Sequence, residues 1–338
     1  MRVEDTVTPG LVAVLALSAG VTPWSPAPGE VLLEFVGDVM LDDGPGKTVS
    51  DGRDPFAGFQ ALLSQADLSV ANLECPVAHD GQLPGKLTTF RAHPRVAKVL
   101  ARHLGAVSVA NNHAGDAGPA AFLETLDHLH AAGVGVFGGG KNLREAHTPL
   151  VVVRKGLRLA FLGYSEFQPR WFEAGPSSPG VAWSEDEQVA WDVQEARHHG
   201  ADVVVAYMHW GWTGDTPTER QRVLGRALVD AGVDVVVGSH AHETQGAEIY
   251  RGHPIIYGLG NFVFDGFDDV PGRTGWLVRL GVDRHGWTRW DTVVARMDEH
   301  GTPHVEPAAP GPCGRRGSDV VSTCDPQRPA HEWRGPTP

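Results

Sequence analysis

The sequence has 338 residues, of which 41% are hydrophobic and 20% are charged, so it holds enough apolar material for a large core. Its net charge of −13 argues against nucleic acid or an anionic membrane as the main partner. An anionic substrate is still compatible with this charge, because a bound cation can reverse the field locally. The length fits one large α/β domain or two smaller ones.

Residues 1–29 are expected to form an extension ahead of the folded domain. The apolar run 11–21 is about eleven residues long, which is too short for a helix that spans a membrane. A secretory leader begins with basic residues, whereas in this chain the acidic residues Glu4 and Asp5 follow the basic Arg2. We therefore predict a cytoplasmic protein without a membrane span, with an exported or membrane-anchored protein as the alternative.

Strand-like runs alternate with helical patterns from residue 31 to about residue 280, and a series of strands follows. This order predicts an α/β fold whose strands are partly parallel and then antiparallel. Ser184 is predicted to cap one helix, with Glu187 completing a capping box, and Thr216 with Pro217 to open the next. The predicted strands are 31–37, 68–71, 106–110, 134–137, 150–154, 157–164, 202–207, 233–237, 248–250, 255–257, 276–282 and 288–295, and other predicted helices are 56–65, 95–103 and 120–131.

Residues 30–300 are predicted to form the folded domain and residues 301–338 a disordered tail. The tail is dense in proline, glycine and polar residues and has no hydrophobic periodicity. Cys313 and Cys324 could pair within it, which would leave Cys75 free. A free cysteine fits a reducing compartment better than a secreted protein.

The most informative local feature is Gly238-Ser239-His240-Ala241-His242, directly after the apolar run 233–237. Histidines two residues apart leave the same side of an extended backbone, so both imidazoles can point at one centre. Taken alone, Asp38 and Asn112 are better explained as helix caps or turn residues. The carboxyl ends of the strands converge in an α/β sheet, however. Because ligand-type residues occur at five of these strand ends, the pattern favours a metal site with nitrogen and oxygen ligands. The other four strand ends contribute Asp38, Glu74, Asn112 with His113, and His209.

These residues belong to an ordered set of motifs between about residue 33 and residue 265. The motifs are Gly37-Asp38-Val39-Met40-Leu41, Asn72-Leu73-Glu74-Cys75-Pro76, Ala110-Asn111-Asn112-His113 with Asp116 and Gly118, His209-Trp210-Gly211, Gly238-Ser239-His240-Ala241-His242, and Gly258-Leu259-Gly260-Asn261-Phe262. The set resembles the CapA-type proteins, named for poly-γ-glutamate capsule synthesis. That family resembles the calcineurin-like metallophosphoesterases, which implies an α/β fold, an αββα sandwich of mixed sheets with metal ions between loop ends.

The resemblance implies a set of metal ligands. Asp38 matches the first metal aspartate, Glu74 lies where a bridging carboxylate sits, and Asn112 matches the amide ligand. The histidine ligands would be His209, His240 and His242. The cofactor would be one or two divalent ions, with Mn, Zn, Fe, Ca and Mg all compatible.

The resemblance also implies a proton donor and one departure from the hydrolases. His113 matches the residue that stabilises or protonates the leaving group, and Asp116 would orient it. The hydrolases carry a histidine two residues after their first aspartate, whereas this chain has Met40. One metal position therefore loses a ligand, a loss that CapA-type proteins share.

Four further residues are predicted to contact the substrate. Arg91 and His93 match a region near the family's site and would bind a carboxylate or phosphate. Trp210 would favour an apolar or aromatic substrate, and Asn261 belongs to the last motif. Residues 168–181 are long enough for a lid or substrate loop.

Three functions are compatible with such a site. The first is a hydrolase or transferase that acts on a peptide or poly-γ-glutamate-type substrate, with metal-activated water and His113 as the acid. The second is a peptide Cα epimerase in ribosomal peptide biosynthesis of the lasso type. The third is a scaffold without enzymatic activity in capsule polymer export. An epimerase needs an acid and a base on opposite faces, and the available pairs are His113 with Asp116 and one of His209, His240 or His242 with Asp38. We predict the first function and make no prediction of the oligomeric state.

Overall fold

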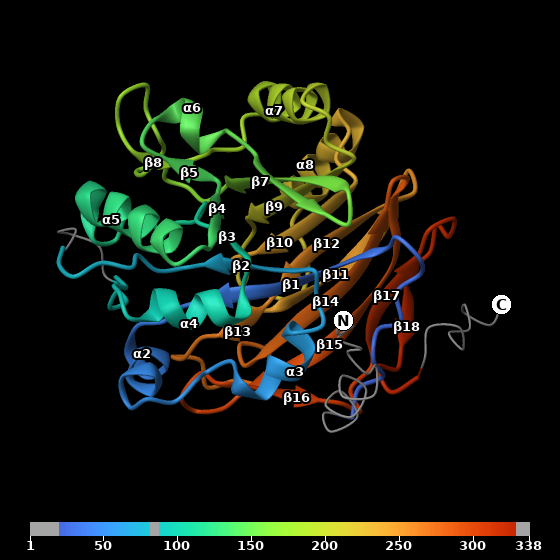
Figure 1. Ribbon diagram of the computed structural model, residues 1–338, viewed down its shortest axis with the longest axis horizontal. Helices are drawn as coiled ribbons and strands as arrows, with labels where there is room; N and C mark the ends of the chain where they lie inside the picture. The colour runs from blue at the N-terminus through green and yellow to red at the C-terminus, as the bar shows by residue number, and fades with distance from the viewer. Residues whose placement is uncertain (1–19, 82–87, 329–338) are drawn as a thin grey trace, which may run out of the picture.

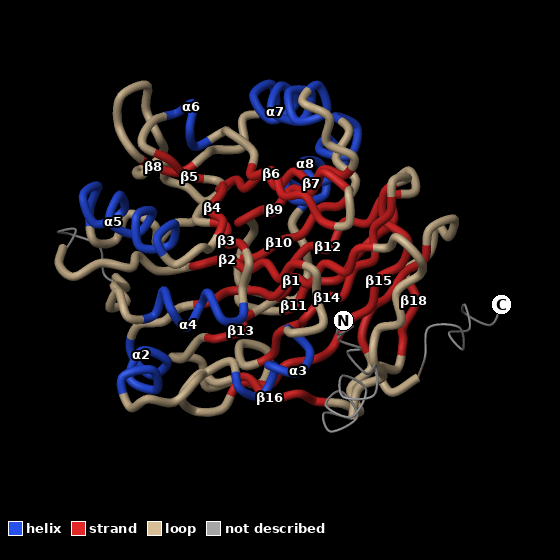
Figure 2. The backbone as a smooth tube through the Cα atoms, in the orientation of Figure 1, coloured by secondary structure: helices blue, strands red, loops and turns tan. Residues whose placement is uncertain are grey.

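The computed structural model describes residues 20–81 and 88–328, so most of the expected N-terminal extension lies outside the described residues. Within these ranges two mixed β-sheets pack face to face, and helices cover the outer side of each sheet (Figure 1). Figure 2 shows the strands gathered in the middle and the helices at the periphery. The predicted α/β sandwich of mixed sheets is therefore confirmed.

The larger sheet has ten strands in the described ranges and is built around β1. On one side of β1 the strands β2, β3 and β4 follow in parallel, and on the other side β14, β15, β17 and β18 run antiparallel. Two short strands, β13 and β16, pair with β1 and β15. The bounds are β1 (Val31–Val39), β2 (Leu68–Leu73), β3 (Ala106–Ser108), β4 (Gly135–Phe137), β13 (Asn261–Val263), β14 (Thr274–Asp283), β15 (Gly286–Met297), β16 (Pro303–Glu306), β17 (Gly311–Arg315) and β18 (Ser322–Cys324).

The second sheet has six strands in the order β11-β12-β10-β9-β7-β6. Its central strands are parallel, and the hairpins predicted at 150–164 and 248–257 form its two antiparallel edges. Strands β5 (Gly139–Gly140) and β8 (Gly180–Val181) pair separately. The bounds are β6 (Leu150–Arg154), β7 (Leu157–Ser165), β9 (Val203–His209), β10 (Val235–Ser239), β11 (Thr244–Tyr250) and β12 (His253–Leu259).

Three apolar cores hold the layers together. The core between the two sheets contains Phe35 from β1, Phe161 from β7 and Val237 from β10, all fully buried. Alternation along the strands sends the intervening side chains outward, where they pack against helices. Val36 thus lies under the helices of the first sheet, and Val236 under those of the second.

The helices differ from the prediction at several places. The predicted helix 56–65 is a 3₁₀ turn followed by a four-residue helix, and the helices at residues 43–50 and 143–146 were not predicted. Ser184 does not cap its helix, whereas Thr218 caps the next one in a capping box with Gln221. No helix in the described ranges is long and apolar enough to cross a membrane. The helices are α2 (Asp43–Ser50), η1 (Ala57–Phe59), α3 (Gln60–Leu63), α4 (Val96–His103), α5 (Gly118–Ala131), α6 (Leu143–Ala146), α7 (Asp186–His198) and α8 (Glu219–Ala231).

The predicted disordered tail is wrong for the part that the structure describes, up to residue 328. Strands β16, β17 and β18 extend the larger sheet, because the twelve-residue strand β15 offers β16 and β17 a long edge for backbone hydrogen bonds and β17 in turn pairs with β18. A disulfide between Cys313 and Cys324 joins β17 to β18, and Cys75 is buried and free, as the pairing predicted.

A buried charged cluster lies across β1, β14 and β15. Arg279 donates two hydrogen bonds to Asp291, of 2.7 and 2.6 Å, and a third of 2.7 Å to the backbone oxygen of Thr22. Glu34 stands opposite Arg279 in the β1–β14 register and is fully buried. Burial raises the pKa of Glu34 to about 8, although Arg279 and a hydrogen bond from Ser69 oppose this. Glu34 is therefore mostly protonated at neutral pH.

Candidate metal centre

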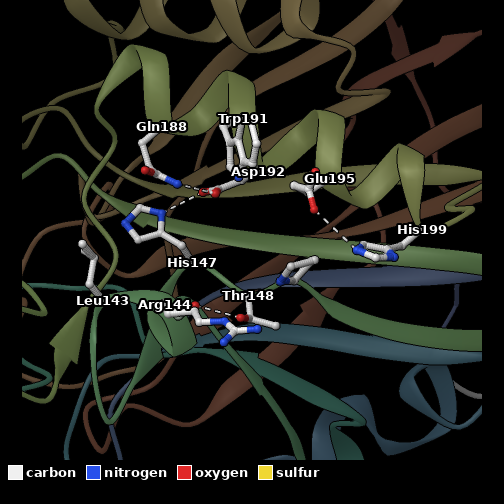
Figure 3. A pocket seen from close by; sticks show the side chains of 10 residues that line it. Leu143, Arg144, His147, Thr148, Gln188, Trp191, Asp192, Glu195 and His199 are labelled. Carbon is white, nitrogen blue, oxygen red and sulfur yellow. Dashed lines mark hydrogen bonds and ion pairs between the residues drawn. The ribbon is translucent and has the colours of Figure 1, made fainter. Parts of the chain in front are cut away.

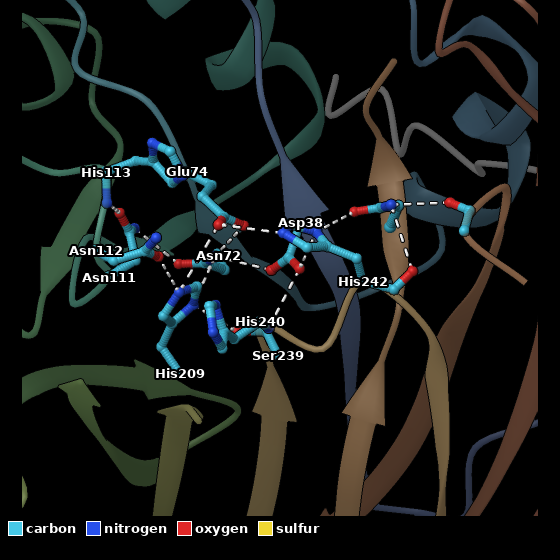
Figure 4. A network of polar contacts seen from close by, with 12 residues as sticks. Asp38, Asn72, Glu74, Asn111, Asn112, His113, His209, Ser239, His240 and His242 are labelled. Carbon is cyan, nitrogen blue, oxygen red and sulfur yellow. Dashed lines mark hydrogen bonds and ion pairs between the residues drawn. The ribbon is translucent and has the colours of Figure 1, made fainter. Parts of the chain in front are cut away.

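The candidate site lies where strand ends from both sheets meet. Asp38 and Glu74 come from the carboxyl ends of β1 and β2 in the larger sheet, and His209 ends β9 in the smaller one (Figure 4). His240 and His242 follow β10, so the two sheets contribute opposite walls of one centre. This is the crevice beyond the carboxyl ends of the strands that an α/β sheet offers to ligands.

A close backbone approach places Asp38. Gly37 lies against Gly260, and a Cβ atom on Gly37 would be 1.8 Å from the backbone oxygen of Gly260. The amide of Asp38 donates to that same oxygen at 3.0 Å. The glycine is required here because any side chain would push β1 away from the segment that carries Asn261, the register partner of Asp38.

The carboxylates and imidazoles form two overlapping groups that share Glu74. Asp38, Glu74 and His209 make one group, and Glu74, His240 and His242 make the other, with donor atoms of each group within 4.8 Å of one another. Oε1 of Glu74 is 3.7 Å from Nε2 of His209 and 3.8 Å from Nε2 of His242. The residue predicted to bridge is thus the one common to both groups.

The amide predicted as a ligand also points into this centre. Oδ1 of Asn112 lies 2.6 Å from Nε2 of His209. The structure therefore brings the six predicted ligands, Asp38, Glu74, Asn112, His209, His240 and His242, into one cluster. Met40 contributes no ligand, because its side chain is buried in the core below the loop.

His240 and His242 have unusual backbone conformations. Their φ angles are +91° and +57°, in the left-handed region that residues other than glycine rarely adopt. These angles turn the chain sharply after β10 and leave the amide of His240 donating to Oδ2 of Asp38 at 3.2 Å. Strain of this kind persists where the surrounding structure enforces it, and it clusters at functional sites.

The electrostatics of His240 fit a metal ligand. Burial, and then the neighbouring His242 and His113, lower the pKa of His240 to about 3, so its ring is neutral at physiological pH. Its Nδ1 atom is buried and has no hydrogen-bond partner among the described residues. A buried polar nitrogen without a partner costs free energy, and a divalent cation would supply that partner. The donor set of this centre therefore fits a metal ion.

Two residues beyond the predicted ligands organise the centre. The side-chain nitrogen of Asn72 lies 2.8 Å from Asp38, 3.3 Å from Glu74 and 3.3 Å from His209, so one amide connects three ligands. Oδ1 of Asn261 accepts from Nδ1 of His242 at 2.9 Å, which leaves Nε2 of that ring for the metal. Asn72 was missed as a site residue although it precedes Glu74 by two positions on the same strand face, a spacing that signals shared orientation.

A His/Asp dyad lies beside the cluster. Nδ1 of His113 is 2.7 Å from Oδ2 of Asp116, which also accepts from the backbone amide of Phe90 at 2.8 Å. The Phe90 ring packs against His113 with centroids 4.5 Å apart. The backbone amide of His113 donates to Oδ1 of Asn111 at 3.0 Å. These contacts fix the orientation of the imidazole next to Glu74 (Figure 4).

Two of the four predicted substrate residues do not face a cavity. Trp210 is fully buried in the core under α8, and its Nε1 donates to the backbone oxygen of Tyr257 at 2.8 Å. This placement corrects the prediction that Trp210 contacts the substrate. Asn261 is also fully buried, and its amide nitrogen donates to the backbone of Gly272 at 2.8 Å, so it orients His242 rather than a substrate.

Arg91 and His93 do line cavities at the edge of the site. A cavity of about 260 Å³ is lined by Arg91, Phe90 and Asp116, and a neighbouring one of about 440 Å³ by Arg91 and His93. Burial and then Arg95 lower the pKa of His93, so its ring is neutral at physiological pH. The larger cavity is lined by three basic side chains, Lys47, Arg91 and Arg95, and by three acidic ones, Asp42, Asp43 and Asp51.

The segment 168–181 packs beside the site. The Phe172 ring lies against Gly115, in the loop between His113 and Asp116, and a Cβ atom on Gly115 would be 2.4 Å from that ring. Phe167, just before the segment, contacts the ring of His240 with centroids 4.7 Å apart and the exposed Trp212 at 5.8 Å. The segment therefore contacts the loop that carries the dyad, and its role as a lid or substrate loop stays a prediction.

A further cavity of about 420 Å³ lies between α6 and α7 and shares no residue with the metal centre (Figure 3). In it, Nδ1 of His147 lies 2.7 Å from Oδ2 of Asp192, which also accepts from the hydroxyl of Tyr164 at 2.8 Å. The network connects α7 to β7. Its His147–Asp192 pair has the same 2.7 Å contact as the His113–Asp116 dyad but lies away from the metal centre.

The described residues form an α/β sandwich of two mixed sheets, with carboxylate, amide and imidazole groups at the strand ends. The family described as "Bacterial capsule synthesis protein PGA_cap" matches residues 32–266, and the chain belongs to this family. The resemblance to CapA-type proteins is therefore confirmed.

Relatives agree with this assignment, and a solved structure shares the fold. The chain is 34% identical over 274 residues to "PGA biosynthesis protein CapA" of Bacillus subtilis (strain 168), covering 79% of this chain and 71% of the relative. It is 28% identical to "Capsule biosynthesis protein CapA" of Bacillus anthracis, covering 75% and 67%. A crystal structure of a hypothetical protein from Thermus thermophilus has the same fold, with a TM-score of 0.52, 15% identity and coverage of 78% and 98%.

Proposed function

We propose that the chain is a metal-dependent enzyme with hydrolase- or transferase-like chemistry on a polyglutamyl or peptide substrate. The observation that carries the proposal is the His113–Asp116 dyad, 2.7 Å apart, beside the cluster of carboxylates and imidazoles. A metal site that served only to stabilise a scaffold would not need a buried acid–base pair next to it. The names of the relatives, which refer to PGA and capsule biosynthesis, support the polyglutamyl substrate class.

The six clustered residues would hold the cation. They are Asp38, Glu74, Asn112, His209, His240 and His242. When bound, a divalent ion at such a site supplies Lewis acidity and lowers the pKa of water.

His113 would act as the general acid. Its Nδ1 is held by Asp116, which keeps the ring oriented and stabilises the imidazolium form. The opposite nitrogen would then give its proton to the leaving amine when an amide bond of the substrate breaks. The packing of Phe90 on the ring limits access of bulk water to it.

Arg91 would bind a carboxylate of the substrate. It lines the same cavity as Asp116, so a carboxylate held by its guanidinium would lie near the dyad. A polyglutamyl chain carries one carboxylate per residue, and Lys47 and Arg95 in the adjoining cavity would bind further ones.

A second candidate, the peptide Cα epimerase, is favoured by a second His/Asp pair. Nδ1 of His242 lies 3.4 Å from Oδ2 of Asp38, in addition to the dyad of His113. Removal of an α-proton and its return from the opposite face need two such groups.

One experiment separates these functions. Purified protein is analysed for metals and incubated with poly-γ-glutamate and with candidate peptides in D₂O, and products are followed by mass spectrometry. Cleaved or transferred chains support the hydrolase or transferase, and deuterium in an uncleaved chain supports the epimerase. If fully metal-loaded protein gave neither cleaved or transferred chains nor deuterated uncleaved chains, both candidate functions would be overturned.

A matched pair of variants tests the role of the dyad. His113→Ala should lose activity, whereas His147→Ala should retain it, because both histidines are buried and bonded to an aspartate at 2.7 Å but only His113 lies at the metal centre. Equal losses in the two variants would mean that His113 acts only on stability.

We also propose that the protein is exported rather than cytoplasmic. The disulfide between Cys313 and Cys324 favours the exported alternative over the cytoplasmic prediction, since disulfides persist in oxidising compartments. Denatured, unreduced protein should therefore show one thiol, that of Cys75, and three after reduction. Three thiols before reduction, in protein isolated from its native host, would support the cytoplasmic prediction.

A further inference from the structure

A second cluster of ligand-type side chains lies on the surface, outside the metal centre. Glu124 and His128 are one helical turn apart on α5, and His79 lies in the loop after β2. Nδ1 of His79 is 2.5 Å and Nε2 of His128 is 3.0 Å from the same oxygen of Glu124. One donor atom from each of the three residues lies within 4.8 Å of the other two. Two imidazoles therefore converge on a single carboxylate oxygen.

The backbone fixes this arrangement independently of the imidazoles. The amide of Val77 donates to the hydroxyl of Thr125 at 2.8 Å, and the amide of His79 donates to Glu124 at 3.1 Å. The loop is thus docked on α5, so the three side chains need little further ordering to bind a ligand together. An ion could reach them directly, because 62% of the His79 side chain and about 30% of the other two are exposed.

We propose that His79, Glu124 and His128 form a second metal site that takes Zn²⁺, with a water molecule as the fourth ligand. Two histidines and one glutamate are a zinc ligand set, and zinc with three protein ligands keeps one position open. Bonds of about 2.0–2.1 Å to a tetrahedral ion set neighbouring donor atoms about 3.3 Å apart. The three donor atoms would reach such spacing through rotation of exposed side chains.

His93 flanks this site but is not one of its ligands. Its ring lies 5.8 Å from that of His79 between centroids, and its Nδ1 accepts from the backbone and side chain of Arg95, both at 3.1 Å. The neutral ring therefore carries its proton on Nε2, which leaves no lone pair on that nitrogen for a metal.

The site would tie α5 to the segment that positions Arg91. Nη1 of Arg91 donates to the backbone oxygen of His79 at 2.5 Å, and Val77 forms a β-bridge with Ala92. A bound ion would thus hold in place the His79 backbone oxygen that accepts from the guanidinium of Arg91. The inference does not depend on the proposed function, because none of its ligands belongs to the metal centre.

The test counts zinc ions on the full chain. Chelator-stripped protein is titrated with Zn²⁺ in competition with a chromophoric chelator, and bound zinc is counted by native mass spectrometry. The double variant His79→Ala/His128→Ala should bind one zinc ion fewer than the wild type. His128→Ala alone should lower the affinity for that zinc ion by at least about tenfold. His130→Ala is the matched control, since His130 is exposed on the same helix but outside the cluster.

A further variant separates this site from the metal centre. His240→Ala should keep the surface zinc while it loses metal from the centre. Equal zinc counts in the wild type and the double variant, or an equal loss with His130→Ala, would overturn the second site. Loss of the surface zinc in His240→Ala would also contradict it, because the two sites share no ligand.

Discussion

The buried carboxyl group of Glu34 should make the stability of the protein depend on pH. Its Oε1 atom is buried without a hydrogen-bond partner among the described residues, and its neighbour Arg279 is already paired with Asp291. Ionised Glu34 would thus leave the cluster with a net negative charge in a medium of low polarity. The folded protein avoids this by keeping the proton, with a pKa raised by burial to about 8.

The sign and the size of the effect follow from proton linkage. Between pH 4.5 and about 8 the folded protein keeps a proton that the unfolded chain has released, so the free energy of unfolding falls as the pH rises. The stabilisation that the Glu34 proton gives to the folded protein is fully present below pH 4.5. It falls progressively above pH 4.5, and its loss is complete once the pH has passed through about 8. At about 1.4 kcal/mol per pH unit, this interval corresponds to roughly 5 kcal/mol at most.

Urea unfolding of the wild type and of Glu34→Gln, at pH values from 4.5 to 9, measures this effect. Glutamine stays neutral, so the free-energy difference between wild type and variant should shift against the wild type by several kcal/mol across the range, with other titrating groups cancelling. Glu187→Gln, at an exposed position on α7, is the control and should show no such shift. A difference for Glu34→Gln that is the same at every pH would refute a protonated Glu34.

Four other substitutions give distinct outcomes. His240→Ala should remove metal and activity together, whereas His113→Ala should remove activity and keep the metal; elemental analysis beside an activity assay separates the two, and unchanged metal in His240→Ala would contradict the ligand assignment. Gly37→Ala should cost at least about 2 kcal/mol of unfolding free energy in urea, because its Cβ would lie 1.8 Å from a backbone oxygen. Trp210→Ala should cost about 3–5 kcal/mol as a core truncation, and a smaller effect would mean that Trp210 is not packed as described.

The sequence allowed the strand ends to be identified because apolar runs stop where polar motifs begin. It also contained the signal that excludes Trp210 from the site. Adjacent side chains at a strand end point to opposite faces, so His209 and Trp210 cannot both face the metal centre. His209 faces it, and Trp210 packs under α8.

Other features depend on contacts that no local pattern encodes. Asn72 acts on Asp38 because β1 and β2 pair in a register that places the two residues side by side, and Asn261 lies opposite Asp38 for the same reason. Register follows from the whole sheet rather than from one segment. The strands after residue 300 were missed because they are three to five residues long and gain their stability from pairing, β16 and β17 with β15 and β18 with β17.

The bond between Cys313 and Cys324 also bears on self-association. An edge strand presents unpaired amide and carbonyl groups to which another chain can add, and short edge strands limit this risk. Here the outermost strand, β18, is three residues long and is cross-linked to β17. Reduction would leave β18 held by backbone hydrogen bonds alone, and its release would uncover the edge of β17 as a template for intermolecular pairing. The disulfide therefore protects the monodispersity of the protein as well as its stability.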